Sequence, residues 1–139
     1  MTSFTYDANG NLLTVKDAKA QTTTYTYDTM DRLLTRKDAL LKTETYTYDL
    51  AGNLATFKDR KANTTTYLND SLNRRTKATF QGGSSTTFNY DVANRLTSLV
   101  DTVGGTITYG YDIVNRLTSE TTALGRLPTR TTPSAAAQR

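Results

Sequence analysis

The sequence predicts an all-β protein made of short antiparallel hairpins, and three observations support this. Thr is the commonest residue, with 30 of 139 positions, and Thr and Tyr at this density favour strands over helices. A Tyr-Asp motif recurs with a period of 21 residues, which marks an internal repeat. Turn-forming residues fall twice in each period. We therefore expect β-hairpin repeats side by side in one curled or spiralling antiparallel sheet, solenoid-like and open-ended.

The repeat runs through six copies without a gap. In the fourth copy Asn69 stands in place of the tyrosine before Asp70, and the other copies keep both residues. We predict that residues 1–125 form this array and that residues 126–139, which hold no aromatic residue, form a degenerate, irregular tail. The motif positions with an expected structural role are Tyr6, Asp7, Gly10, Tyr27, Asp28, Asp31, Tyr48, Asp49, Gly52, Asp70, Asn73, Tyr90, Asp91, Asn94, Tyr111, Asp112 and Asn115.

The alternation of large and polar side chains predicts the first strand of each copy. The segment 24–27 reads Thr-Tyr-Thr-Tyr, and large and polar side chains that alternate with a period of two indicate a half-buried strand. The residue two before the motif tyrosine is aromatic in every copy: Phe4, Tyr25, Tyr46, Tyr67, Phe88 and Tyr109. This aromatic ladder would suit sugar binding by stacking, but the packed face of the sheet is the favoured interpretation.

The segment after the motif tyrosine predicts the first turn. Asp suits the first turn position, and Gly, Asn or Asp suits the fourth, where φ is positive. A type I turn followed by a left-handed residue is a common three-residue hairpin loop. In the fifth copy this loop would place Asp91 opposite Arg95, as a cross-strand ion pair, and Tyr90 opposite Leu96.

A return strand and a second turn complete each copy. The return strand is predicted at 12–15 in the first copy and 96–100 in the fifth. The fourth copy carries Asn69, Arg75 and Lys77 at positions where other copies have different residues, so we expect its hairpin to persist but to pack loosely. The second turns are predicted at residues 17–20, 38–41, 59–62, 81–84 and 101–105.

The composition excludes most catalytic chemistry. The chain has no His and no Cys, so it lacks imidazole acid–base groups and thiol nucleophiles. The repeated Asp is better explained as a turn cap than as paired catalytic carboxylates. The segment 7–11 resembles a calcium loop, but it lacks the downstream Glu and later copies lose the pattern. We therefore expect no enzyme activity, no catalytic residue, no cofactor and no metal.

The net charge of the chain and the unpaired strands at the ends of the array indicate which partners to expect. Residues 1–125 contain 14 Lys and Arg against 13 Asp and Glu, a net charge of +1, which argues against a nucleic-acid partner. The sequence has no apolar run long enough to span a membrane. Each end of such an array would expose an unpaired strand. We therefore expect head-to-tail self-association into a homo-oligomer or filament.

The motif Tyr-Asp-x-x-Gly-Arg-Leu at this spacing resembles the YD repeat, also called the Rhs repeat. Copies two, five and six read Asp-Arg-Leu or Asn-Arg-Leu at its end, and copies one and three read Gly-Asn-Leu. Such repeats occur in bacterial Rhs proteins, in cage-forming subunits of toxin complexes, in wall-associated proteins and in teneurins. The resemblance implies a strip of hairpins that spirals into a hollow shell, which encloses a toxic domain in bacterial members.

The same resemblance implies a role and a location. We expect a non-catalytic structural segment of a secreted or surface-associated protein, outside the cell or on its surface. Its partners would be a toxin domain or flanking repeats of a longer parent, besides other copies of itself. The alternative is a repeat module that binds carbohydrate, such as a cell-surface glycan, or another cell-surface partner.

Overall fold

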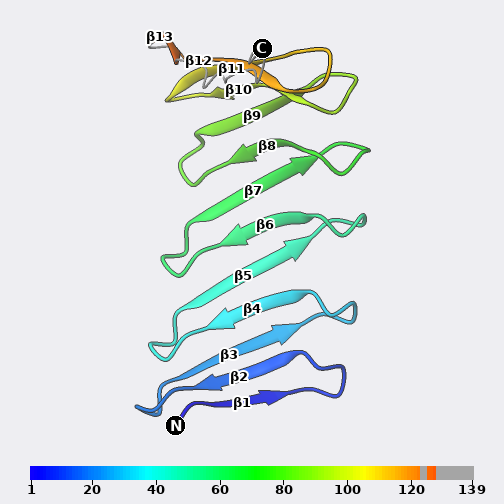
Figure 1. Cartoon of the computed structure of the whole chain (residues 1–139). Coiled ribbons are helices and arrows are strands. Elements are labelled where there is room, and N and C mark those ends of the chain that lie inside the picture. The colour runs from blue at the N-terminus through cyan, green and yellow to red at the C-terminus, as the bar shows by residue number, and fades with distance from the viewer. Residues whose placement is uncertain (123–124, 128–139) are drawn as a thin grey trace, which may run out of the picture. The chain divides into compact units, whose positions relative to one another are not determined.

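The structure is a computed structural model that describes residues 1–122 and 125–127. The chain divides into two units, residues 1–83 and residues 84–139. All regular elements in the described residues are strands, and within each unit every strand pairs antiparallel with the next along the chain (Figure 1). The predicted fold, with hairpins side by side in an open sheet, is confirmed. None of the described residues forms a helix that could cross a membrane.

The first unit holds eight strands, two for each of the first four copies. Its strands are β1 (Ser3–Tyr6), β2 (Leu12–Lys16), β3 (Thr22–Tyr27), β4 (Leu33–Lys37), β5 (Thr43–Tyr48), β6 (Leu54–Lys58), β7 (Thr64–Asn69) and β8 (Arg75–Thr79). The described part of the second unit holds β9 (Ser85–Tyr90), β10 (Leu96–Asp101), β11 (Gly105–Tyr111), β12 (Leu117–Thr122) and β13 (Gly125–Leu127).

A β-bulge in each motif hairpin decides which side chains share a face. In the first copy Phe4 lies opposite Val15 and Tyr6 lies opposite Leu12, with the register shift at Leu13. Leu12 and Val15 are three residues apart, yet both lie on the face of the aromatic residues because the bulge adds one residue to the strand. Simple alternation would have placed them on opposite faces.

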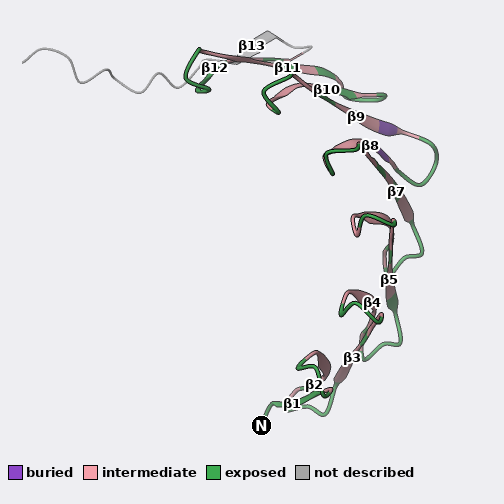
Figure 2. Ribbon diagram, turned by 90° about the vertical axis from the view of Figure 1, so that its right-hand side faces the viewer, coloured by how far each residue is buried: buried purple, intermediate pink, exposed green. Residues whose placement is uncertain are grey.

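Within each unit the strands form a single layer without a thick core, as Figure 2 shows. Among the described residues, only Ala78, at 4% exposure, and Ser85, at 7%, count as buried. Most strand residues are half-buried, because their cover comes from neighbours in the same sheet. Stability in such a fold comes from contacts between adjacent repeats, as in other solenoids.

The fourth copy keeps its hairpin, as predicted. Asn69 of β7 lies opposite Arg75 of β8, the same register as Tyr and Leu in other copies. The expected loose packing of this copy stays a prediction, but the position is filled, because the Arg75 guanidinium lies 3.8 Å from the centre of the Tyr67 ring. The arginine thus contacts the aromatic ladder from the position of the usual leucine.

Pairing continues beyond the predicted end of the array at residue 125. Strand β13 pairs with β12, with Arg126 opposite Thr121 and Leu127 opposite Glu120. The remainder of the predicted tail, residues 128–139, lies outside the described residues.

Candidate functional site

The candidate site is the repeated motif itself, and its Asp residues cap the first turns. In copy one, Asp7 Oδ1 accepts hydrogen bonds from the backbone N–H groups of Asn9, at 2.9 Å, and Asn11, at 2.8 Å. Its Oδ2 accepts a third bond from Asn11 Nδ2 at 3.0 Å. The backbone closes the same loop, because Gly10 N–H donates to the Asp7 carbonyl at 3.2 Å. The same backbone contacts, at 2.8–3.0 Å, recur at Asp28, Asp49, Asp70, Asp91 and Asp112.

The fourth turn position has the left-handed backbone that the sequence predicts. Gly10 and Gly52 have φ values of 89° and 87°, which glycine adopts without strain. Asp and Asn are the side-chain-bearing residues that tolerate this region best. The remaining copies have φ of 59° at Asp31, 60° at Asn73, 64° at Asn94 and 66° at Asn115.

Hydrogen bonding keeps these carboxylates charged. Donation from Asn11 holds the pKa of Asp7 below its usual value, and donation from the Arg32 backbone does the same for Asp28. The pKa is also lowered at Asp49, Asp70, Asp91 and Asp112. Charged carboxylates that already accept several hydrogen bonds serve as turn caps and are poor proton donors. Among the described residues, no cluster of acids suits a metal ion.

The Asp–Arg pairing predicted from the sequence is confirmed. In copy five Arg95 Nε donates to Asp91 Oδ2 at 2.7 Å, and Tyr90 lies opposite Leu96. Equivalent arginine contacts join Arg32 to Asp28 and Arg74 to Asp70, each at 2.8 Å.

The motif tyrosines join each copy to the one before it. The Tyr27 hydroxyl donates to the Leu12 carbonyl at 3.0 Å, and the Tyr48 hydroxyl donates to the Leu33 carbonyl at 2.9 Å. Tyr111 does the same to Leu96 at 2.8 Å. Each acceptor lies 15 residues earlier, in the preceding hairpin. Burial raises the pKa of Tyr27, so its hydroxyl stays protonated and able to donate.

The Asn or Arg that follows the turn joins each copy to the next. Asn53 Nδ2 donates to Asn73 Oδ1 at 2.9 Å, and Arg95 Nη1 donates to Asn115 Oδ1 at the same distance. The Arg32 guanidinium lies 4.5 Å from the ring centre of Tyr48, which belongs to the next copy. The sequence indicated the Asp91–Arg95 ion pair within the fifth hairpin but gave no signal for this second contact. A 20-residue offset between polar side chains would have been the pattern to seek.

The second turns of the first three copies use the same cap, from Asp17, Asp38 and Asp59. Asp38 Oδ1 accepts from the backbone of Leu40 at 2.9 Å and of Lys42 at 3.0 Å. The left-handed residue here is Leu41, with φ of 61°, and its counterparts are Ala20 at 63° and Ala62 at 67°. The sequence located these turns but did not reveal that Ala and Leu carry the positive φ.

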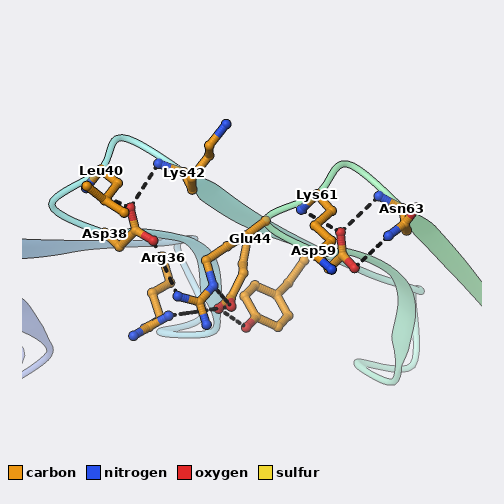
Figure 3. Close-up of polar contacts among 10 residues, drawn as sticks. Arg36, Asp38, Leu40, Lys42, Glu44, Asp59, Lys61 and Asn63 are labelled. Atoms are coloured by element: carbon orange, nitrogen blue, oxygen red, sulfur yellow. Dashed lines mark hydrogen bonds and ion pairs between the residues drawn. The ribbon is translucent and has the colours of Figure 1, made fainter.

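One ionic cluster near these turns was not foreseen (Figure 3). Glu44 Oε1 lies 3.0 Å from Arg60 Nε, and Glu44 Oε2 lies 3.4 Å from Arg36 Nη1 and accepts from the Tyr46 hydroxyl at 3.2 Å. Arg60 also reaches Asp38 Oδ2 at 3.3 Å. The carboxylates are only 14–16% exposed and are already paired, so the cluster links copies two and three instead of offering a free catalytic group.

The aromatic ladder lies against its cross-strand partners. Tyr46 and Phe57 have ring centres 5.1 Å apart and planes tilted by 37°. Phe88 lies opposite Leu99, and Tyr67 lies opposite Ala78. These contacts favour the packed-face interpretation over sugar stacking.

Sequence comparison identifies the repeat. Residues 6–43, 70–106 and 90–127 match the RHS Repeat family, and together these segments make up more than half of the chain. A comparison with curated proteins found no match.

Solved structures with a similar fold come from toxin complexes. One is the crystal structure of TcdB2-TccC3-Cdc42, with a TM-score of 0.76 and 22% identity over 87% of this chain. Another is the Photorhabdus luminescens Tc holotoxin pore with a TccC3 mutation, with a TM-score of 0.73 and 22% identity over 87% of this chain. This chain spans 7% of the length of each matched chain. From its motif, its hairpins and these matches, the chain belongs to the RHS repeat family.

Proposed function

We propose that the chain is a non-catalytic structural segment of a secreted or surface-associated Rhs-repeat protein. The observation that supports this best is that the motif side chains already contact the array itself. Asp49 caps its own turn, Tyr48 donates to the preceding copy and Asn53 donates to the following one. These side chains hold adjacent copies together in a continuous sheet, and their polar groups are already engaged in hydrogen bonds within the array.

The proposed setting is part of the shell of a longer protein, outside the cell or on its surface. The similar structures are of toxin complexes, and this chain corresponds to 7% of the length of the matched chains. In such a shell the partners of the segment would be flanking repeats and a toxin domain. The array would extend over residues 1–125.

For the isolated chain, we propose assembly by strand addition at β1, the edge that a flanking repeat would cover in a longer protein. Every residue of β1 is exposed, including Phe4 at 53% and Tyr6 at 59%. A neighbouring hairpin of the same kind would offer Tyr6 a backbone carbonyl, as Leu12 does for Tyr27. Because the added strand differs from β1, the contact would be head-to-tail and would build a ring or a filament.

Light scattering and negative-stain microscopy at micromolar concentration test this assembly. We expect elongated oligomers for the unmodified chain. Phe4→Lys should reduce them, because lysine on an edge strand opposes strand addition. Leu50→Lys is the matched control, since Leu50 is fully exposed at a turn away from β1. A stable monomer of 15.4 kDa, or equal loss in both variants, would contradict assembly through β1.

A further inference from the structure

The face of β1–β8 opposite the aromatic ladder carries an unusual set of side chains, and we name it the Thr/Lys face. It is defined by the residues that share a face with Thr5 when the pairing is followed from strand to strand. At these paired positions the residues are Thr, Lys or Ser, with Leu68 as the exception. Its four lysines are Lys16, Lys37, Lys58 and Lys77.

The Thr/Lys face carries positive charge without acidic neighbours on the same face. The acids of residues 1–83 lie in or next to turns, except Glu44, which pairs with Arg36 on the aromatic face. Lys16, Lys37 and Lys58 are exposed, and none of the four lysines forms an ion pair with another described residue. Their charge is therefore available to a ligand.

Hydroxyl groups on this face are held in fixed positions. Thr5 and Thr14 have hydroxyl oxygens 2.7 Å apart, and the same contact joins Thr26 to Thr35 at 2.7 Å and Thr47 to Thr56 at 2.6 Å. Each hydroxyl pair has spare acceptor capacity, because a hydroxyl offers one donor and two lone pairs. The pairs recur every 21 residues, like the lysines.

The spacing of the lysines matches a long ligand. Lys16, Lys37 and Lys58 occupy equivalent positions on every second strand. Neighbouring strands are about 4.8 Å apart, so these charges recur at about 10 Å along the unit. A regular row of charges favours an extended polymer with repeated anionic groups over a single small anion.

We propose that the Thr/Lys face binds an extended polyanionic glycan, of the sulfated polysaccharide class. Lysine ammonium groups suit sulfate and carboxylate groups, and the threonine hydroxyls suit the hydroxyls of sugar rings. Single-stranded nucleic acid is a poorer fit, because its bases stack on aromatic side chains and these lie on the opposite face. This ligand class does not depend on strand addition at β1, so either proposal can fail without the other.

The test uses the full chain and fluorescently labelled heparin as the probe. We expect binding at about 0.15 M salt that weakens as salt rises, and no binding to neutral dextran. The triple variant Lys16→Gln, Lys37→Gln, Lys58→Gln should weaken binding roughly tenfold, because three exposed ionic contacts are lost. The matched control is the triple variant Lys19→Gln, Lys42→Gln, Lys61→Gln, which removes the same charge from residues outside the Thr/Lys face and should change affinity by less than about twofold.

A second measurement avoids substitution altogether. Heparin should slow the acetylation of Lys16, Lys37 and Lys58, measured by mass spectrometry, more than that of Lys19, Lys42 and Lys61. Equal protection of both sets, equal loss of affinity in both triple variants, or absence of heparin binding would overturn the proposal. Tighter binding to single-stranded DNA than to heparin would also overturn it, because the ligand class would then be wrong.

Discussion

The two units of the chain share one motif but differ in lysine content and in the residues of their second turns. All seven lysines lie in residues 1–83, and residues 84–139 have none. The first three second turns place Ala20, Leu41 and Ala62 at positive φ, whereas Gly105 has this role in the second unit, with φ of 85°. Yet Asp28 and Asp91 cap their turns with the same contacts.

The difference indicates which positions carry the fold. Tyr111 in the second unit donates to Leu96 as Tyr48 does to Leu33 in the first. The positions that link copies are thus kept in both units, while the face away from the aromatic ladder varies. Acid and substitutions at the shared motif residues, followed by a substitution at a second-turn residue that differs between the units, would test this interpretation.

The largest effect should come from acid, which removes the shared caps in both units together. The pKa of Asp28, Asp49 and Asp91 is lowered in the folded state, chiefly by backbone hydrogen bonds, so protons bind the unfolded chain more readily. Their stabilisation is therefore complete above the unfolded pKa of about 3.9 and is lost as pH falls through the folded values. Thermal unfolding monitored by circular dichroism should show a melting temperature that drops steeply below about pH 4. A melting temperature that rises on acidification would contradict the capping role.

The next largest effect should come from Tyr48→Ala. This change removes the hydroxyl bond to Leu33 and the ring beneath Arg32, so we expect a loss of about 2–4 kcal/mol in urea unfolding. Tyr6→Ala is the matched control. Tyr6 is 59% exposed, and its variant should lose less than about 1 kcal/mol. Equal losses of unfolding free energy in the two variants would mean that the contact of Tyr48 with the preceding copy adds little to stability.

Gly52 tests the shared turn. Gly52→Val should destabilise by roughly 1–3 kcal/mol, because a β-branched side chain is poor at a φ of 87°. Gly52→Asn should be close to neutral, since Asn73, Asn94 and Asn115 stand at the same position in other copies. A Cβ at Gly52 would lie 3.6 Å from Arg32 Nη1, an ordinary contact. Urea unfolding of both variants gives the comparison, and equal losses would refute the turn assignment.

The smallest effect concerns a turn position that differs between the units. Leu41→Gly should stabilise by about 0.5–1 kcal/mol, because Leu41 has a φ of 61° and its side chain is mostly exposed. The same change at Leu40, which is also exposed but has no positive φ, should not stabilise. Urea unfolding of both variants would show whether the backbone conformation is the cause.

The sequence predicted local features well because they depend on nearby residues. Loop length fixes which residues face each other, so the pairing of Asp91 with Arg95 and of Tyr90 with Leu96 was foreseen. Contacts between hairpins depend on the register of one hairpin relative to the next, which no turn within a single hairpin determines. Neither the Arg32–Tyr48 contact nor the Glu44 cluster follows from a local pattern. The positive φ of Leu41 was also missed, because its residue type opposes that conformation.

The central claim is that motif side chains bind one copy to the next, and a double-mutant cycle between Arg32 and Tyr48 tests it most directly. Urea unfolding of Arg32→Met, Tyr48→Leu and the double variant would give the coupling energy between these residues of adjacent copies. The guanidinium lies 4.5 Å from the ring centre, so we predict a favourable coupling of about 0.5–1 kcal/mol. Additive losses, with no coupling beyond experimental error, would contradict the claim.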